Sequence, residues 1–309
     1  MIAFSIVIPV YNKEAFIGKT IESVLAQSYV GFELILVNDG STDNSETIIK
    51  DYTNDTRVRL VSQENQGAAA ARNRGIAEAK NDYIALLDAD DLWYADHLQT
   101  HAKNIQAFPE KELFASNSYL QVGNKKRSRV FSIPTPKKPS LVDFFEASLI
   151  DSLINSSTVV IKRSLLDRCG GFDERLTRTE DTDLWVRLAH ETQVVFDPKH
   201  TVCVVRDSKG LSQKSVAQQH KLKFEKFKDL EAKNPTAKRY LDLNRYALAL
   251  ESRLQGDAQE AAQLSSEVDL KNLNSKQRFL LARGTASLRM LFKIKGILAR
   301  LGLGLSAYK

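Results

Sequence analysis

The first part of the chain alternates short apolar runs with segments of helical periodicity, and this alternation limits the fold more than any other feature. Apolar runs at 5–8, 32–37 and 58–61 have the composition of strands, and the first two end at Pro9 and at Asn38-Asp39-Gly40. Strands that alternate with helices predict a mostly parallel sheet with helices on both faces. We therefore expect an α/β fold of the Rossmann-like class here.

A fourth apolar run, Tyr83-Ile84-Ala85-Leu86-Leu87, leads directly into Asp88-Ala89-Asp90-Asp91. A strand of this kind places three carboxylates at the sheet edge where open α/β folds bind ligands. So much negative charge favours a divalent cation, since Mg²⁺ and Mn²⁺ prefer oxygen ligands and often bridge to phosphates. We predict that Asp90, Asp88 and Asp91 hold such an ion, with Asp90 the best candidate for direct contact. The structural alternative is a solvated acidic turn that caps the next helix.

Three further polar clusters follow strands, and in a parallel sheet they would meet the acidic cluster at one edge. They are Pro9-Val10-Tyr11-Asn12, Asn38-Asp39-Gly40-Ser41-Thr42-Asp43, and Asn65-Gln66-Gly67 leading to Ala71-Arg72-Asn73. Each alone reads as a capped turn or a helix start. Together they predict a site that reads a base with carboxylate and amide groups and steadies phosphates with Arg72. The glycine-rich loops of dinucleotide-binding and Walker-type sites are absent from the sequence.

A fifth cluster lies about ninety residues later, where Gly170-Gly171-Phe172-Asp173-Glu174 precedes Thr179-Glu180-Asp181. In structural terms, Thr179 is an N-cap and the two acids interact favourably with the helix dipole. In functional terms, a carboxylate at a helix start can accept a proton from an incoming hydroxyl. The two interpretations are compatible.

Taken together, the five clusters resemble the motifs of family 2 glycosyltransferases of the GT-A fold, over roughly residues 4–190. The matching stretches are Val7-Ile8-Pro9-Val10-Tyr11-Asn12, Val37-Asn38-Asp39-Gly40-Ser41-Thr42-Asp43, Gly67 with Ala71-Arg72-Asn73-Arg74-Gly75, Leu87-Asp88-Ala89-Asp90-Asp91, and Gly170-Gly171-Phe172-Asp173 to Glu180-Asp181. The resemblance implies a nucleotide-sugar donor, most often a UDP-sugar, a divalent ion (Mn²⁺ or Mg²⁺) and inversion at the anomeric carbon.

The resemblance also implies roles for individual residues. By position, Asp39 would contact the base, Arg72 the nucleotide, and Asp181, with Glu180 beside it, would be the catalytic base. The nucleotide-sugar site implied in this way comprises Pro9, Tyr11, Asn12, Asp39, Gly67, Arg72, Asp88, Ala89 and Asp90. One element departs from the family pattern, because Arg206-Asp207-Ser208 stands where many members carry Arg-x-His.

The net charge of +6 comes from the last forty residues, which carry nine Lys and Arg and no acid. Residues 1–269 carry 35 basic and 38 acidic side chains, so the charge does not indicate a nucleic-acid partner. No leader peptide and no bilayer-length apolar run are found, which predicts a cytoplasmic protein. The two cysteines, Cys169 and Cys203, are predicted to be reduced thiols rather than a disulfide.

The basic tail, residues 284–309, has helical periodicity. Its apolar face comprises Leu288, Leu291, Phe292, Leu298 and Leu301, with Arg289, Lys293 and Arg300 on another face. This pattern predicts peripheral contact with the inner face of the cell membrane. The alternative is a helix that packs on its neighbours.

We expect a glycosyltransferase domain over 1–212, with a donor half at 1–108 and an acceptor half at 109–212, followed by a helical region over 213–309. The acceptor half includes a basic loop, predicted to be mobile, at 123–140. The expected activity is transfer of a sugar to a hydroxyl of a growing surface glycan, free or lipid-linked. The alternatives are a polyprenyl-phosphate sugar synthase and a non-catalytic nucleotide-sugar-binding scaffold.

Overall fold

The computed structural model describes residues 2–206 and 222–300, with the backbone alone for 295–300. The chain divides into two compact units, the first formed by 1–144 and 151–223 and the second by 145–150 and 224–309. The domain boundary predicted between 212 and 213 lies outside the described residues and stays a prediction.

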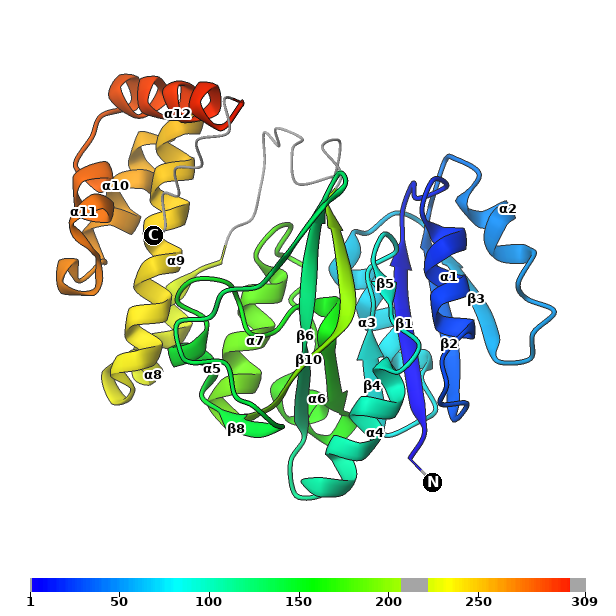
Figure 1. The fold of residues 1–309 in the computed structure, drawn as a ribbon. Coiled ribbons are helices and arrows are strands. Elements are labelled where there is room, and N and C mark those ends of the chain that lie inside the picture. The colour runs from blue at the N-terminus through cyan, green and yellow to red at the C-terminus, as the bar shows by residue number, and fades with distance from the viewer. Residues whose placement is uncertain (1, 207–221, 301–309) are drawn as a thin grey trace. The chain divides into compact units, whose positions relative to one another are not determined.

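The first unit contains a ten-stranded mixed sheet and its flanking helices (Figure 1). Its elements in chain order are β1 Phe4–Val10, α1 Ile17–Leu25, β2 Phe32–Asp39, α2 Ser45–Lys50, β3 Val58–Gln63, α3 Ala68–Glu78, β4 Tyr83–Leu86, β5 Leu92–Trp93, α4 His97–Ala107, β6 Leu113–Val122, β7 Lys125–Ser128, β8 Ser140–Val142, α5 Phe144–Ala147, which continues into the second unit, η1 Ser156–Thr158, β9 Val159–Lys162, α6 Arg163–Cys169, α7 Glu180–Glu191 and β10 Val194–Arg206.

The sheet order is β3-β2-β1-β4-β9-β6-β10-β5, with β7 added to β6 and β8 to β10. The four strands β3, β2, β1 and β4 are parallel, as the alternation of strands and helices predicts. Because β9 is antiparallel to both β4 and β6, strands β4, β6 and β10 all point the same way. Their carboxyl ends therefore lie along the same edge as those of β1 and β2.

Alternating side chains of the central strands bury against helices on both faces of the sheet. Ile6, Ile8 and Leu34 belong to one core cluster, whereas Ile35 and Val37 pack with Ala71 of α3 on the opposite face. Gly75 allows this second contact, because a Cβ there would lie 2.3 Å from Val7 Cγ1. The expectation of an α/β fold with helices on both faces is confirmed.

Two local expectations differ from the structure. The basic loop predicted at 123–140 contains the exposed strand β7. Thr179 precedes α7, but its Oγ1 accepts from Leu222 N at 2.8 Å and makes no capping bond.

The second unit is helical throughout its described residues. Its elements are η3 Phe224–Phe227, α8 Lys228–Lys233, α9 Pro235–Gln255, α10 Ala258–Ser266, η4 Leu270–Asn272, α11 Ser275–Leu281 and α12 Thr285–Arg300. Pro235 opens α9, and Gly256 ends it in the left-handed conformation before Asp257 caps α10. The all-helical character expected for this region is confirmed.

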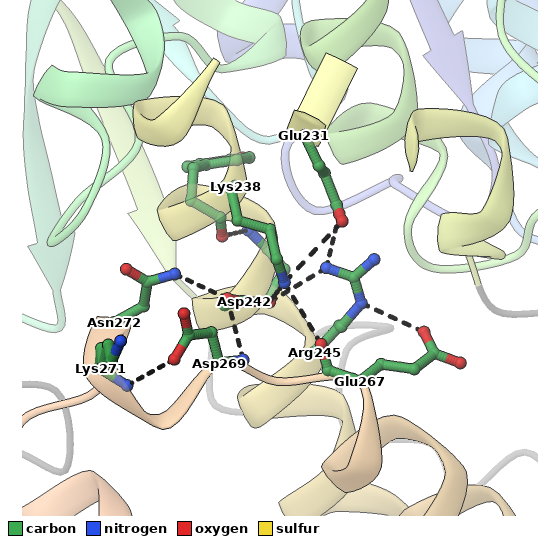
Figure 2. A network of polar contacts seen from close by, with 10 residues as sticks. Glu231, Lys238, Asp242, Arg245, Glu267, Asp269, Lys271 and Asn272 are labelled. Carbon is green, nitrogen blue, oxygen red and sulfur yellow. Dashed lines mark hydrogen bonds and ion pairs between the residues drawn. The ribbon is translucent and has the colours of Figure 1, made fainter. Parts of the chain in front are cut away.

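A network of buried charges joins the helices of this unit (Figure 2). Asp242, fully buried on α9, accepts from Lys238 Nζ at 2.5 Å and from Arg245 Nη1 at 3.1 Å. Arg245 is 2% exposed and also pairs with Glu231 and Glu267. The network therefore links α8, α9 and the residue that follows α10.

The start of α12 packs within its own unit. Leu288 is fully buried, and Arg289 Nη2 donates to Leu254 O at 3.0 Å. Met290 and Ile294 are exposed instead. Membrane contact through 284–309 stays a prediction, and residues 301–309 lie outside the described part. Among the described residues, no helix has the length and apolar character needed to cross a membrane.

Candidate functional site

The site is built around the guanidinium of Arg72, which lies in the second turn of α3. Arg72 Nη2 donates to Asp88 Oδ1 at 2.8 Å. On the other side, Arg72 Nη1 lies 3.4 Å from Asp181 Oδ1 and 3.7 Å from Glu180 Oε1. One cation thus brings together the carboxylate that follows β4 and the two carboxylates that begin α7, although more than ninety residues separate these segments.

Arg72 is 5% exposed, and its guanidinium lies over the Phe172 ring at 5.2 Å. Burial alone would lower its pKa, but the charges of Asp181 and Asp88 outweigh it and raise that pKa. Arg72 is therefore a permanent cation that holds three acids in a partly desolvated space. A guanidinium suits this place because its planar fork can serve several carboxylates at once.

The two acids of α7 differ in exposure. The Asp181 side chain is 39% exposed and the Glu180 side chain 13%. Burial raises the pKa of Asp181, Arg72 opposes that rise, and Asp88 adds to it. Burial also raises the pKa of Glu180, and the charge of Asp181 raises it further. Ser156 Oγ approaches both Asp181 oxygens, at 3.4 and 3.5 Å.

Asn73 fixes the loop that leads to α7. Its side-chain amide forms a reciprocal pair with the Phe172 backbone, accepting from the N–H at 2.8 Å and donating to the carbonyl at 2.9 Å. Gly171 is required beside it, because a Cβ there would lie 2.4 Å from Asn73 Oδ1. Arg187 Nη1 and Nη2 donate to Gly170 and Gly171 carbonyls at 2.8 Å. The predicted cluster at 170–174 is thus a positioning loop for Phe172 and α7.

The three aspartates after β4 lie in three different environments. Asp88 binds Arg72, and Asp90 forms an ion pair with Lys13 Nζ. Asp91 is 3% exposed, and its two oxygens accept from Ser157 Oγ and from Val205 N at 2.8 Å. Burial and the charge of Asp88 raise the pKa of Asp91 well above its ordinary value. Asp91 therefore ties the acidic loop to β10, and Asp88 and Asp90 remain the more accessible carboxylates.

The residues expected to bind the base lie at the same sheet edge but are partly engaged with one another. Asp39 is 2% exposed, and its carboxylate accepts from Gln63 Nε2 at 2.8 Å and from Gln66 N and Gly67 N at 2.9 Å. Gly67 has φ 93°, which favours glycine at the entrance to α3. The Asp39 carboxylate thus shapes the loop before α3, and its predicted contact with a base stays a prediction.

The loop after β1 is bound to the loop after β2. Asn12, which has φ 51°, accepts from Thr42 N at 2.8 Å through Oδ1, and Lys13 N donates to Ser45 Oγ at 2.8 Å. Pro9 lies within β1, Tyr11 directly follows it, and Ala89 is buried with its carbonyl accepting from Thr20 Oγ1. These residues frame the edge of the site, and their roles in donor binding stay predictions.

Sequence reasoning did not single out Lys13, Ser156 or Ser157, which contact Asp90, Asp181 and Asp91 respectively. Lys13 directly follows the predicted Tyr11-Asn12 cluster, so a basic residue beside that motif was an available signal. The serines carry no such signal. In the described part of the chain, no group of three or more His, Cys, Asp or Glu side chains is arranged to hold a metal by itself.

Comparison with known proteins follows the same motifs. Residues 5–153 match the protein family described as Glycosyl transferase family 2. An uncharacterized glycosyltransferase of Rickettsia typhi is 34% identical over 194 residues, which make up 62% of this chain and 60% of that protein. The segment at 5–153 of this chain belongs to glycosyl transferase family 2.

A further relative, the amylovoran biosynthesis glycosyltransferase AmsB of Erwinia amylovora, is 32% identical over 201 residues, 60% of this chain and 64% of that protein. The chain therefore spans about three fifths of the length of the curated relatives named here.

Solved structures extend the likeness to the whole fold. TarS from S. aureus, solved as a fragment with UDP-GlcNAc, has a TM-score of 0.69 at 20% identity over 97% of this chain and 92% of that chain. Mannosyltransferase PcManGT from Pyrobaculum calidifontis, solved with GDP-Man and Mn²⁺, has a TM-score of 0.51 at 16% identity over 95% and 86%. The GT-A fold expected for this chain is confirmed.

Proposed function

We propose that this chain transfers a sugar from a nucleotide-sugar, a UDP-sugar by preference, to a hydroxyl of a growing surface glycan, with inversion at the anomeric carbon. The observation that carries the proposal is the meeting of Asp88, Glu180 and Asp181 at the Arg72 guanidinium. The named ligand of TarS and the biosynthetic role in the name of AmsB support the donor and the acceptor class.

Asp181 is the better base of the two acids on α7. A general base must reach the acceptor hydroxyl, and the Asp181 side chain is three times more exposed than that of Glu180. Its raised pKa makes the carboxylate a stronger proton acceptor than an ordinary aspartate. Glu180, deeper and beside Arg72 Nη1, positions that guanidinium.

The acidic loop fits a divalent ion of the Mg²⁺ or Mn²⁺ kind. Asp88 and Asp90 offer carboxylate oxygens, and such ions are commonly bound through one or two carboxylates together with substrate phosphates. When bound there, the ion would supply Lewis-acid stabilisation to the departing diphosphate. The relative solved with Mn²⁺ supports this assignment. Asp91 is a weaker candidate, because Ser157 and Val205 already engage both of its oxygens.

The protein's own cations complete the donor side. Lys13 forms an ion pair with Asp90, and Arg72 forms one with Asp88. Two positive charges therefore border the position that a bound diphosphate would occupy. Both side chains have N–H groups left to donate to phosphate oxygens, because an ammonium has three donors and a guanidinium five. These residues bind and orient the leaving group as its negative charge grows.

Replacement of Asp90 by Ala is expected to abolish the Mn²⁺-dependent part of donor binding, because it removes an oxygen ligand and frees Lys13. A thermal-shift panel of nucleotide-sugars with and without Mn²⁺ measures this directly, since a ligand at 100 times its Kd stabilises the folded state by about 2.7 kcal/mol. Asp96→Ala, a surface carboxylate on the turn before α4, is the matched control.

Undiminished Mn²⁺-dependent stabilisation in the Asp90 variant would remove this residue from the metal site. A wild-type chain that is stabilised by none of the nucleotide-sugars would instead contradict the proposed donor. Analysis of the transfer product then separates a glycoside from a polyprenyl phosphosugar, the product of the alternative synthase activity.

A further inference from the structure

The hairpin formed by β6 and β7 carries an unusual concentration of exposed cations. Lys125, Lys126 and Arg127 follow one another on β7, and all three are exposed. The turn is made by Gly123, with φ 55°, and the residue after it. In the described part of the chain, β7 pairs with β6 alone, so its outer edge is open.

Two more cations lie beside this hairpin, Arg129 at its base and Arg206 next to its turn. Arg129 Nε donates to Ser118 Oγ at 2.9 Å, and Arg206, at the end of β10, lies opposite Val122 in the register of β6. Burial lowers the pKa of Arg129, and the charges of Arg206 and Arg127 lower it further, against the opposing charges of Asp151 and Asp91. Positive charge is thus present at both ends of the hairpin.

Few acidic side chains form ion pairs with these five cations. Asp151 Oδ2 accepts from Arg127 Nη1 and also from Val130 N, both at 2.9 Å. No other ion pair of the five appears among the described residues. Lysines on an edge strand commonly protect a sheet against edge-to-edge association. This protection accounts only for the charges on β7 itself. It does not explain why Arg129 and Arg206, which lie off the edge, add positive charge at the two ends of the hairpin.

The hairpin lies beside the acidic loop of the proposed active site. Val205, the neighbour of Arg206, donates to Asp91, which directly follows Asp90. On the β7 side, Lys126 Nζ lies 3.5 Å from the Tyr94 hydroxyl and over the Tyr94 ring at 5.9 Å, and Tyr94 follows the short strand after Asp91. Strands β6 and β10 run side by side toward this edge (Figure 1).

We infer that this basic hairpin, defined by Lys125, Lys126, Arg127, Arg129 and Arg206, binds an acceptor glycan that carries phosphate or carboxylate groups along its chain. The inference rests on the proposed function and adds the chemical class of its acceptor. Alternate residues of a strand lie about 7 Å apart on one side, so Lys125 and Arg127 can meet successive charges of an extended polymer. Lys126, between them, projects from the opposite side of β7 and contacts the Tyr94 ring.

The test measures binding of fluorescent oligogalacturonate and of inorganic polyphosphate to the full chain, with neutral dextran as the uncharged probe. We expect both anionic probes to bind and dextran not to bind. The triple variant Lys125→Gln/Lys126→Gln/Arg127→Gln should bind the anionic probes about tenfold more weakly, because each exposed ion pair contributes modestly. Higher salt should weaken wild-type binding and narrow this difference, because exposed charges are screened.

A matched variant controls for net charge. Lys19→Gln/Lys50→Gln/Lys103→Gln removes three exposed cations from α1, α2 and α4 and should bind like wild type. Equal weakening in both triple variants would overturn the inference, because the binding would then follow net charge alone. The inference is also wrong if the hairpin variant loses binding to phosphatidylglycerol vesicles while the soluble polyanions never bind, since the hairpin would then recognise lipid headgroups.

These binding measurements contain no donor, so their result does not depend on the proposed activity. In a transfer assay, the hairpin variant should have a higher KM for a charged acceptor than the wild type. Its thermal stabilisation by the donor should be unchanged. If no nucleotide-sugar stabilised the wild-type protein, the proposed function would be contradicted, but the result for polyanion binding would still hold. Unchanged KM for every charged acceptor would contradict the hairpin inference alone.

Discussion

Replacing Asp181 by Asn is expected to lower the rate of sugar transfer by about 10²–10⁴-fold, the usual contribution of a general base. The substitution keeps the size of the side chain and removes its negative charge, and with it the capacity to accept the acceptor proton. Donor binding should persist, because Asp88, Asp90 and Arg72 remain in place. Transfer kinetics and donor-induced thermal shifts on the same preparation separate the two effects.

Glu180→Gln provides the comparison that assigns the base. Its side chain lies deeper and beside Arg72 Nη1, so its loss should disturb the position of Arg72 and reduce the rate less than the loss of Asp181 does. A larger defect in the Glu180 variant, or near-normal turnover of the Asp181 variant, would show that the base has been assigned to the wrong residue.

The pH profile gives a second, independent reading of the base. The pKa of Asp181 is raised above the ordinary value of 3.8, and only the ionised form can accept a proton. Activity should therefore fall on the acid side through an apparent pKa higher than that of an ordinary aspartate. Because Glu180 and Asp181 interact, this apparent value belongs to the pair. A Glu180→Gln variant removes one negative neighbour and should shift the acid limb to lower pH.

The parts of the fold that follow from local pattern were predictable. The apolar run at 83–87 ends in carboxylates, and the structure places β4 there with its carboxyl end at the shared sheet edge. The order of the motifs along the chain indicated the family, and the comparisons confirm it.

Contacts between distant segments were not predictable. Nothing in the local sequence marks Asp91 as the buried member of the acidic cluster, but Ser157, 66 residues away, and Val205, 114 residues away, bury it and tie it to β10. Similarly, the Thr179 hydroxyl accepts from Leu222 and makes no capping bond to α7. No local propensity encodes either choice, because both depend on which chain segments the tertiary fold brings together.

Replacing Arg245 by Met is expected to destabilise the helical unit by about 3–5 kcal/mol, the usual effect of breaking a buried ion pair from one side. Arg245 is 2% exposed and pairs with Glu231 at 2.6 Å, Asp242 at 3.1 Å and Glu267 at 3.3 Å (Figure 2). Met keeps most of the side-chain volume, so the decrease in stability measures the effect of the lost charge rather than that of a cavity. Lys238 alone would then face the carboxylates of Glu231 and Asp242.

The measurement must resolve the two units, because a chain of this kind need not unfold in one step. Hydrogen exchange of the α9 amides in increasing urea reports the helical unit, and donor-induced thermal stabilisation reports the first unit. Arg239→Met, an exposed arginine on the same helix, is the matched control and should change stability by no more than about 0.5 kcal/mol. If the Arg245 variant matched this control, the network would be contributing little to stability, as buried charges do when their desolvation cancels their attraction.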